Sequence, residues 1–278
     1  MSYLTEPFAY EFFVRALVVT VLIGALAGAL GPFVLVRRMA YIGQGMSQSV
    51  LGGVALAVTF GVDLYLGAAV SAGVAAWLIQ MVRRRGLPVD TAIGIVASGL
   101  FAVGVAVVSS SRDRRLNTAN LLFGNVLGVD TEDIVLVTIV TVVAGVVLVA
   151  NYKPLLAATH NAAVAAAHGV PARVMEIVFN VLLAMVVVTA LRVLGVLLVA
   201  ATLLIPAATA TTTFRSFNQI VVASTALGVA CSIIGLFLSF HRNIASGAAI
   251  VLVGASVFVL NAMLSVFGRG RPPGRIRA

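Results

Sequence analysis

The chain has 278 residues, of which 61% are hydrophobic and only 10% are charged, and its mean hydropathy is +1.13. A soluble globular domain carries about 25% charged residues. The composition therefore excludes that class and predicts an all-α, polytopic membrane protein whose residues 1–278 form a single transmembrane domain. The formal net charge of +9 does not indicate a nucleic-acid partner, because the basic residues gather at the ends of apolar segments.

Nine apolar runs are long enough to cross a bilayer. They are residues 16–36, 39–62, 64–82, 91–111, 134–152, 174–191, 193–214, 216–240 and 243–268. The first contains a stripe of small residues, Gly24, Gly28 and Gly31, which favours close helix packing. The seventh contains Gly195 and Pro206, and because proline removes a backbone hydrogen bond, we expect a kink or break at Pro206. If that run is only re-entrant, the number of spans falls, so we predict eight to nine.

The distribution of charge predicts the orientation, because short cytoplasmic loops carry an excess of Lys and Arg. Nine crossings with the N-terminus outside place most basic clusters in the cytoplasm: Arg37–Arg38, Arg83–Arg85, Lys153, Arg173, Arg215 and the tail arginines. Arg192 and Arg242 then fall outside, and the cluster Arg112, Arg114 and Arg115 argues mildly against this orientation. The tail, residues 269–278, is basic and is predicted to be mobile.

Residues 154–172 are uncharged but too weakly hydrophobic for a span. They include two prolines, several alanines, His160 and His168, which suits one or two short helices at the membrane surface. His160, His168 and His241 show no metal-ligand spacing with a carboxylate, and the sequence has no Gly-rich phosphate loop of the Walker type. We therefore expect a protein that is not an enzyme and does not itself hydrolyse nucleotide.

The second apolar run begins with polar side chains just after a basic pair. On a helix, Gln44 and Gln48 lie one turn apart on the same face, with Ser47 beside them. Uncharged amides inside a hydrophobic segment are costly unless they meet a partner, a cavity or a passing solute. These three residues are the candidates for a substrate path.

The sequence resembles the permease subunits of bacterial ABC importers for manganese, zinc or iron, over about residues 16–267. Each matching piece is weak alone, but their order and spacing are specific. The pieces are Gly31–Met39, Asp90–Gly94, Leu122–Leu127, Ala190–Ala200, Leu204–Ala210 and Ser246–Leu252.

The resemblance implies a type II ABC-importer-like fold in the bacterial cytoplasmic membrane, surrounded by lipid. Its implied partners are a second copy of the chain, with the path between the two copies, a dimer of a separate cytoplasmic ABC ATPase, and an extracytoplasmic metal-binding protein. No permanently bound cofactor is implied. The expected cargo is a divalent ion, zinc or manganese, with iron or a metal complex as further options.

The resemblance also implies a role for the segment 154–172. The stretch from Asn161 to Pro171 corresponds to the family's coupling helix, which docks into the ATPase. Ala165 and Gly169 are small, as close docking requires, whereas Asn161, Ala162 and Ala163 replace residues that are usually acidic. A plain surface helix that joins two spans is the alternative.

The largest departure from the family lies at the candidate path. The family carries Asp where this chain has Gln44, His where it has Gln48, and Pro where it has Gly52. Neutral amides are poor ligands for divalent transition metals. Three explanations compete: the metal passes as a complex, the bare ion makes only transient contacts, or the substrate is something else. A fourth interpretation is that both glutamines hydrogen-bond across the dimer.

Two other functions stand beside a divalent-metal importer. One is a permease for an iron chelate, such as haem or a siderophore, because such permeases share the same broad architecture. The other is a non-transporting membrane scaffold that has lost its ligand pair. The retained coupling segment and Pro206 argue against the scaffold.

Overall fold

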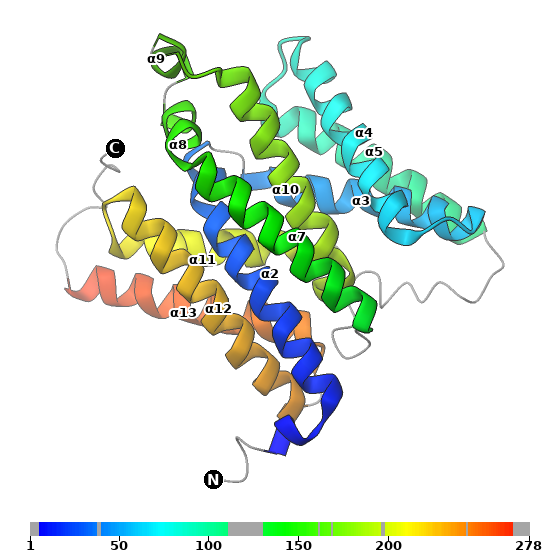
Figure 1. The fold of residues 1–278 in the computed structure, drawn as a ribbon, viewed down its shortest axis with the longest axis vertical. Coiled ribbons are helices and arrows are strands. Elements are labelled where there is room, and N and C mark those ends of the chain that lie inside the picture. Colours follow the sequence, from blue (N-terminus) through cyan, green and yellow to red (C-terminus); the bar gives the residue numbers. More distant parts are fainter. Residues whose placement is uncertain are drawn as a thin grey trace.

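A computed structural model describes residues 6–37, 40–110, 130–160, 162–167, 169–195, 198–242 and 244–268 (Figure 1). Over these residues the regular structure is helical. The elements are η1 (Glu6–Ala9), α2 (Glu11–Val36), α3 (Ala40–Phe60), α4 (Leu64–Arg83), α5 (Val89–Ser110), α7 (Thr131–Ala150), α8 (Tyr152–His160), α9 (Ala162–Ala167), α10 (Ala172–Leu194), α11 (Val199–Thr213), α12 (Phe217–Arg242) and α13 (Ser246–Gly268). The predicted mobile tail, 269–278, lies outside the described residues.

Each of the nine predicted apolar runs is occupied by one helix. Among the described residues, seven helices are long and apolar enough to span a membrane, namely α2, α4, α5, α7, α10, α12 and α13. The remaining two runs form α3, with 21 residues, and α11, with only 15. The predicted all-α, multi-pass architecture is therefore confirmed, and α11 is the short member of the set.

The segment 154–172 forms short helices, as predicted. Figure 1 shows α9 and the start of α10 at the same end of the bundle as the turn between α4 and α5, with α8 close by. Contacts bring further helix ends to this place: Arg37 at the end of α2 meets α8, and Arg83 at the end of α4 meets the start of α10. At the opposite end, Tyr65 at the start of α4 meets Asp133 at the start of α7. Arg37 and Arg83 thus lie at one end of the bundle and Asp133 lies at the other, as the predicted orientation requires.

The predicted small-residue stripe on α2 packs against two other helices. A Cβ atom added to Gly24 would lie 2.7 Å from the carbonyl oxygen of Gly228, and one added to Gly28 would lie 2.5 Å from that of Ser224, both on α12. A Cβ on Gly31 would lie 2.2 Å from the carbonyl oxygen of Leu203 on α11. Since no side chain fits at these positions, the glycines set how closely α2 approaches its neighbours.

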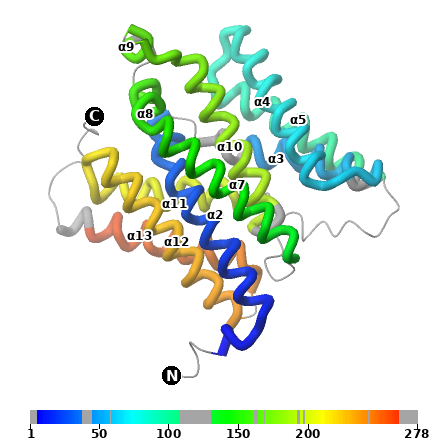
Figure 2. Tube along the Cα trace, viewed as in Figure 1, coloured from blue at the N-terminus to red at the C-terminus, as the bar shows by residue number. Residues whose placement is uncertain are grey.

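The helices α3, α4 and α5 pack together on one side of the molecule (Figure 2). A Cβ on Gly53 would meet the backbone of Gly67 on α4, at 2.4 Å, and a Cβ on Gly52 would meet that of Leu100 on α5, at 2.6 Å. The hydroxyl of Ser71 on α4 also donates to the carbonyl oxygen of Ser49 on α3, at 2.7 Å. Close packing on two sides therefore fixes the helix that carries the candidate path residues.

The chain is interrupted at Gly195, whereas α11 continues through Pro206, the position where a kink or break was expected. Gly195 has φ 79°, in the left-handed region that glycine adopts without steric cost, and it caps α10. Pro206 lies inside α11, which continues from Val199 to Thr213. A proline within a membrane helix is tolerated when neighbouring helices pack around it, and Pro206 is buried.

Candidate substrate path and coupling segment

The candidate path residues lie in the first half of α3. The helix runs from Ala40 to Phe60, so Gln44 and Gln48 are one turn apart, as predicted. Ser47 is fully buried and Gln48 is half-buried, whereas the side chain of Gln44 lies outside the described residues. Where the structure describes it, α3 thus places one amide at a partly open position of a helix that is otherwise mostly buried.

Gln48 differs from its neighbour Ser49 on the same helix. The hydroxyl of Ser49 donates to the carbonyl oxygen of Gly45 at 2.7 Å, so its hydrogen bond is made within the helix. The amide of Gln48 makes no hydrogen bond to any residue that the structure describes. It can offer one oxygen acceptor and two N–H donors to a solute or to a partner chain.

The two histidines that the structure describes make hydrogen-bond contacts within their own helices. His160, on α8, and His241, on α12, are exposed, and the Nδ1 atom of each lies about 3 Å from a carbonyl oxygen one turn earlier in its own helix. His168 lies outside the described residues. Within the described ranges, no group of three or more His, Cys, Asp or Glu side chains could hold a metal ion.

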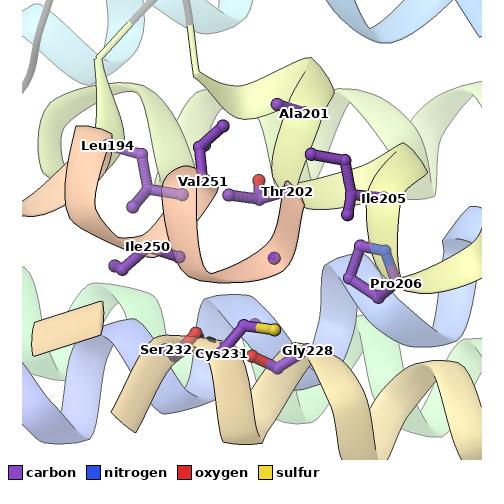
Figure 3. Close-up of a pocket in the computed structure, with 12 residues that line it drawn as sticks. Leu194, Ala201, Thr202, Ile205, Pro206, Gly228, Cys231, Ser232, Ile250 and Val251 are labelled. Carbon is purple, nitrogen blue, oxygen red and sulfur yellow. Dashed lines mark hydrogen bonds between the residues drawn. The ribbon is translucent and has the colours of Figure 1, made fainter. Parts of the chain in front are cut away.

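A small cavity lies where α10 ends and α11 begins (Figure 3). Leu194 and Thr202 line it together with Gly24 of α2 and Ile250 of α13, so the turn at Gly195 lies level with the middle of α2. The space open to water is about 20 Å³, enough for roughly one molecule. Thr202 and Ser232 donate to carbonyl oxygens of their own helices, at 2.8 and 2.9 Å. The cavity is too small for a transport path.

The predicted coupling segment contains a well-defined helix end. At the end of α9, the backbone amide of Gly169 donates to the carbonyl oxygen of Ala166 at 3.0 Å. The backbone amide of Val170 donates to the carbonyl oxygen of Ala165, also at 3.0 Å. This pair of bonds is a Schellman motif, which requires a left-handed residue, and Gly169 has φ 78°. A Cβ on Gly169 would meet nothing within 4 Å. Within this chain, Gly169 thus ends a helix and makes no close contact. Ala165 is buried, and Asn161 lies outside the described residues.

Aromatic side chains anchor α8 to the bundle. The ring of Phe33, near the end of α2, packs edge-on against Tyr152 of α8 and Phe217 of α12, with centroids 5.9 and 4.9 Å apart. His160 packs edge-on against Phe217 at 5.6 Å. The hydroxyl of Tyr152 donates to Oδ1 of Asn218 at 2.5 Å. Both ends of α8 are therefore fixed to transmembrane helices.

A cluster of charged side chains connects α8 to the end of α2 and, through α10, to α4. Nε of Arg37 donates to Oγ1 of Thr159 on α8 at 3.0 Å, and its guanidinium carbon lies 4.2 Å from the centroid of the Phe179 ring on α10. Burial lowers the pKa of Arg37, and the nearby carboxylate of Glu176 opposes that change. Glu176 also forms an ion pair with Arg83 of α4, with N and O 3.0 Å apart.

Sequence reasoning missed this cluster because it treated Arg37 and Arg83 only as indicators of topology. The partners are far along the chain: 122 residues separate Arg37 from Thr159, and 93 separate Arg83 from Glu176. The available signal was Glu176, a carboxylate within an apolar run, because a charge at such a position needs a partner.

Comparison with known proteins agrees with this architecture. The model of the ABC 3 transport family matches residues 9–265. The chain is 34% identical over 261 residues to the manganese transport system membrane protein MntC of Listeria monocytogenes, covering 94% of this chain and 93% of the relative. It is 32% identical over 260 residues to the chelated iron transport system membrane protein YfeC of Yersinia pestis, covering 93% and 88%.

A solved structure extends the likeness from sequence to fold. A chain of PsaBC from Streptococcus pneumoniae, determined in complex with Fab, superposes with a TM-score of 0.85 at 32% identity, and the match covers 94% of each chain. The family model and these relatives each span nearly the whole protein, including α3 and the α8–α9 segment. This multi-pass cytoplasmic-membrane protein therefore belongs to the ABC 3 transport family.

Proposed function

We propose that the protein is the membrane permease of an ABC importer whose cargo is manganese or a related divalent transition metal. The observation that carries the proposal is the end-to-end sequence match with the manganese transport system membrane protein MntC, together with the end-to-end fold match with a chain of PsaBC. Two copies of the chain would form the membrane core, and a separate cytoplasmic ATPase would drive it. An extracytoplasmic protein would deliver the metal.

The path would run beside α3. Gln48 supports this assignment because its amide is half-buried and makes no hydrogen bond with the described residues. An amide oxygen coordinates a divalent ion weakly and carries no charge. Weak contacts suit a path, since an ion that binds too tightly leaves slowly. In this mechanism Gln44 and Gln48 replace a few water molecules around the ion and then release it.

The segment formed by α8 and α9 would receive the ATPase. It lies at one end of the bundle, and it contacts α2, α10 and α12. A helix that is packed against three spans can transmit a displacement, because packed side chains transmit strain instead of absorbing it. The exposed positions of α9 and the loop at Gly169 would form the docking surface.

An iron chelate remains the second candidate cargo. It is favoured by the likeness to YfeC, whose name assigns it to chelated iron transport, and by the neutral glutamines. Amides donate and accept hydrogen bonds, so they suit a polar metal complex as well as a bare ion.

Transport by the reconstituted complex separates the two cargoes. The permease and its ATPase are placed in proteoliposomes, with ATP inside the vesicles and the delivery protein outside, and uptake of Mn²⁺, Zn²⁺, Fe²⁺ and a ferric siderophore is compared. ATP-dependent uptake of Mn²⁺ that exceeds uptake of the siderophore supports the proposal. Uptake of the ferric siderophore alone would show that the cargo is an iron chelate and not a bare metal ion. If none of the four substrates is taken up, the proposed function is contradicted.

A further inference from the structure

One arginine side chain brings together three elements that lie far apart in the sequence. Arg37 caps the C-terminal end of α2. Its Nε donates to the hydroxyl of Thr159 on α8, at 3.0 Å, and its guanidinium group lies over the ring of Phe179 on α10, at 4.2 Å. Phe179 is fully buried, so the half-buried arginine covers a core residue. The last turn of α2 is thereby fixed to both α8 and α10.

A second charged residue continues this connection to α4. Glu176 lies one turn before Phe179 on α10 and attracts Arg37. Its Oε1 is 3.0 Å from the guanidinium of Arg83, at the end of α4. The side chains of Arg83 and Glu176 are 31% and 34% exposed, so water screens their attraction only in part.

From α4 the connection reaches the helix that carries the candidate path. The hydroxyl of Ser71 on α4 donates to the carbonyl oxygen of Ser49 on α3, next to Gln48. The backbones of the two helices also approach closely at Gly53 and Gly67. A displacement of the start of α10 is therefore applied to α2 through Arg37 and to α3 through α4.

We propose that Arg37 is a positioning residue that couples movement of α8 to the helices of the substrate path, by way of Phe179, Glu176 and Arg83. This inference rests on the proposed function, in which an ATPase moves the α8–α9 segment. The guanidinium group suits the role because it donates a hydrogen bond through Nε while its flat face stacks on a ring. Lysine keeps the charge but cannot do both.

The inference is tested by the amount of metal transported for each ATP hydrolysed. Mn²⁺ uptake and ATP hydrolysis are measured on the complete transporter in proteoliposomes, for wild type, Arg37→Gln and Arg37→Lys. The matched control is Arg84→Gln, which removes an exposed arginine from the same end of the molecule. We expect Arg37→Gln to keep hydrolysis within about twofold while uptake per ATP falls about tenfold, because binding of the nucleotide is unaffected and only the linked movement is lost. Arg37→Lys should recover part of the uptake, and Arg84→Gln should resemble wild type.

Two results would overturn the inference. One is an unchanged ratio of uptake to hydrolysis in Arg37→Gln. The other is a parallel fall of both activities with no recovery in Arg37→Lys, which is the behaviour of a residue needed only for folding. Thr159→Val provides a second test that removes only the hydroxyl acceptor, and it should lower the ratio in the same direction.

Failure of the proposed function is recognised separately. If the wild-type complex shows no ATP-driven Mn²⁺ uptake, hydrogen exchange of the purified permease still tests the connection at Arg37. Amides of α8 should exchange faster in Arg37→Gln than in Arg84→Gln, whereas amides of α5 should not change. Equal exchange of α8 in the two variants contradicts a positioning role for Arg37 whatever the cargo is.

Discussion

The hydroxyl of Tyr65 on α4 donates a hydrogen bond to Oδ1 of Asp133 on α7, and the two oxygens are 2.5 Å apart. Asp133 is buried, and its Oδ2 accepts from the backbone amide of Asp130, so both carboxylate oxygens have partners. At its other end α4 is held by the ion pair between Arg83 and Glu176. α4 is therefore fixed at both ends to helices outside the α3–α5 group.

Tyr65→Phe should destabilise the protein. The change removes one donor from a buried carboxylate, and an under-satisfied buried group costs about 1–3 kcal/mol. Thermal unfolding of the purified protein in detergent, followed by fluorescence-detected size exclusion, measures the effect. Tyr10→Phe is the matched control, because Tyr10 is exposed. Equal midpoints for the two variants would contradict the structural role of Tyr65.

Close packing of α2 and α12 predicts a second stability effect. A Cβ on Gly228 would lie 2.2 Å from the carbonyl oxygen of Gly24, so Gly228→Leu must push the helices apart. We expect a loss of about 3 kcal/mol and lower yield of monodisperse protein. Gly145→Leu, on α7, is the control, because a Cβ there meets nothing within 4 Å. Similar yields and similar unfolding midpoints for the two variants would contradict the close packing of α2 against α12.

The end of α9 predicts a difference between two substitutions at one position. Gly169 has φ 78°, so Gly169→Ala forces a Cβ into the left-handed region at a cost of about 1 kcal/mol, while Asn tolerates that conformation better. Gly169→Asn should therefore keep more transport than Gly169→Ala. The initial rate of Mn²⁺ uptake at equal protein level is the measurement, and the reverse order would show that side-chain size matters and backbone conformation does not.

Docking of the ATPase predicts the effect of a bulky charge on α9. Ala166→Arg places a guanidinium at an exposed position of the coupling segment. Uptake and substrate-stimulated ATP hydrolysis should both fall, while the permease still inserts and dimerises. Normal uptake would locate the docking surface elsewhere. Ala165→Arg, on the same helix, places the charge at a position buried within the chain, so it shows how a loss of folding differs from the loss of docking expected at Ala166.

Charge segregation predicts which helix ends face the cytoplasm. In a Cys231→Ala background, a cysteine replacing Arg84 should be inaccessible to a membrane-impermeant maleimide in intact cells. A cysteine replacing Val62, next to Asp63, should react. Both positions are exposed, so access to the reagent depends on the side of the membrane. Labelling of position 84 from outside would show that the predicted topology is wrong.

The helices could be predicted from the sequence because apolar runs bounded by charged residues indicate membrane spans directly. The predicted run 134–152 and α7, Thr131–Ala150, differ only at their ends, where the acidic residues of a capping box begin the helix. The first helix begins at Glu11, earlier than predicted, and Glu11 forms an i,i+4 ion pair with Arg15. Charged residues just outside the predicted apolar runs thus belong to the helices themselves.

The sequence was less informative about the site, since contacts between distant residues leave no local pattern. The amide pair at Gln44 and Gln48 followed from helical spacing and from the family resemblance. The contact of Arg37 with Thr159 depends on how α2 packs against α8 and α10, which no periodicity encodes. Pro206 gave a misleading signal, because buried packing keeps α11 continuous while Gly195 interrupts the chain.

The glutamine face also predicts a gain of metal dependence. The double change Gln44→Asp with Gln48→His places a carboxylate and an imidazole one turn apart on α3, and both groups bind divalent transition metals well. We expect tighter binding of Zn²⁺ or Mn²⁺ by the purified permease and a changed ion preference in uptake. If the glutamines only join the two copies, isothermal titration should show no new metal binding.

The central claim, that metal crosses the membrane beside α3, is tested most directly by the initial rate of ATP-driven Mn²⁺ uptake in the double variant Gln44→Leu with Gln48→Leu. Leucine is well tolerated in an apolar span, so the variant should fold and dimerise. It loses two hydrogen-bonding groups worth about 1 kcal/mol each, and the rate should fall about tenfold or more. A wild-type rate, measured on a variant whose dimer is intact by size exclusion, would remove these residues from the path.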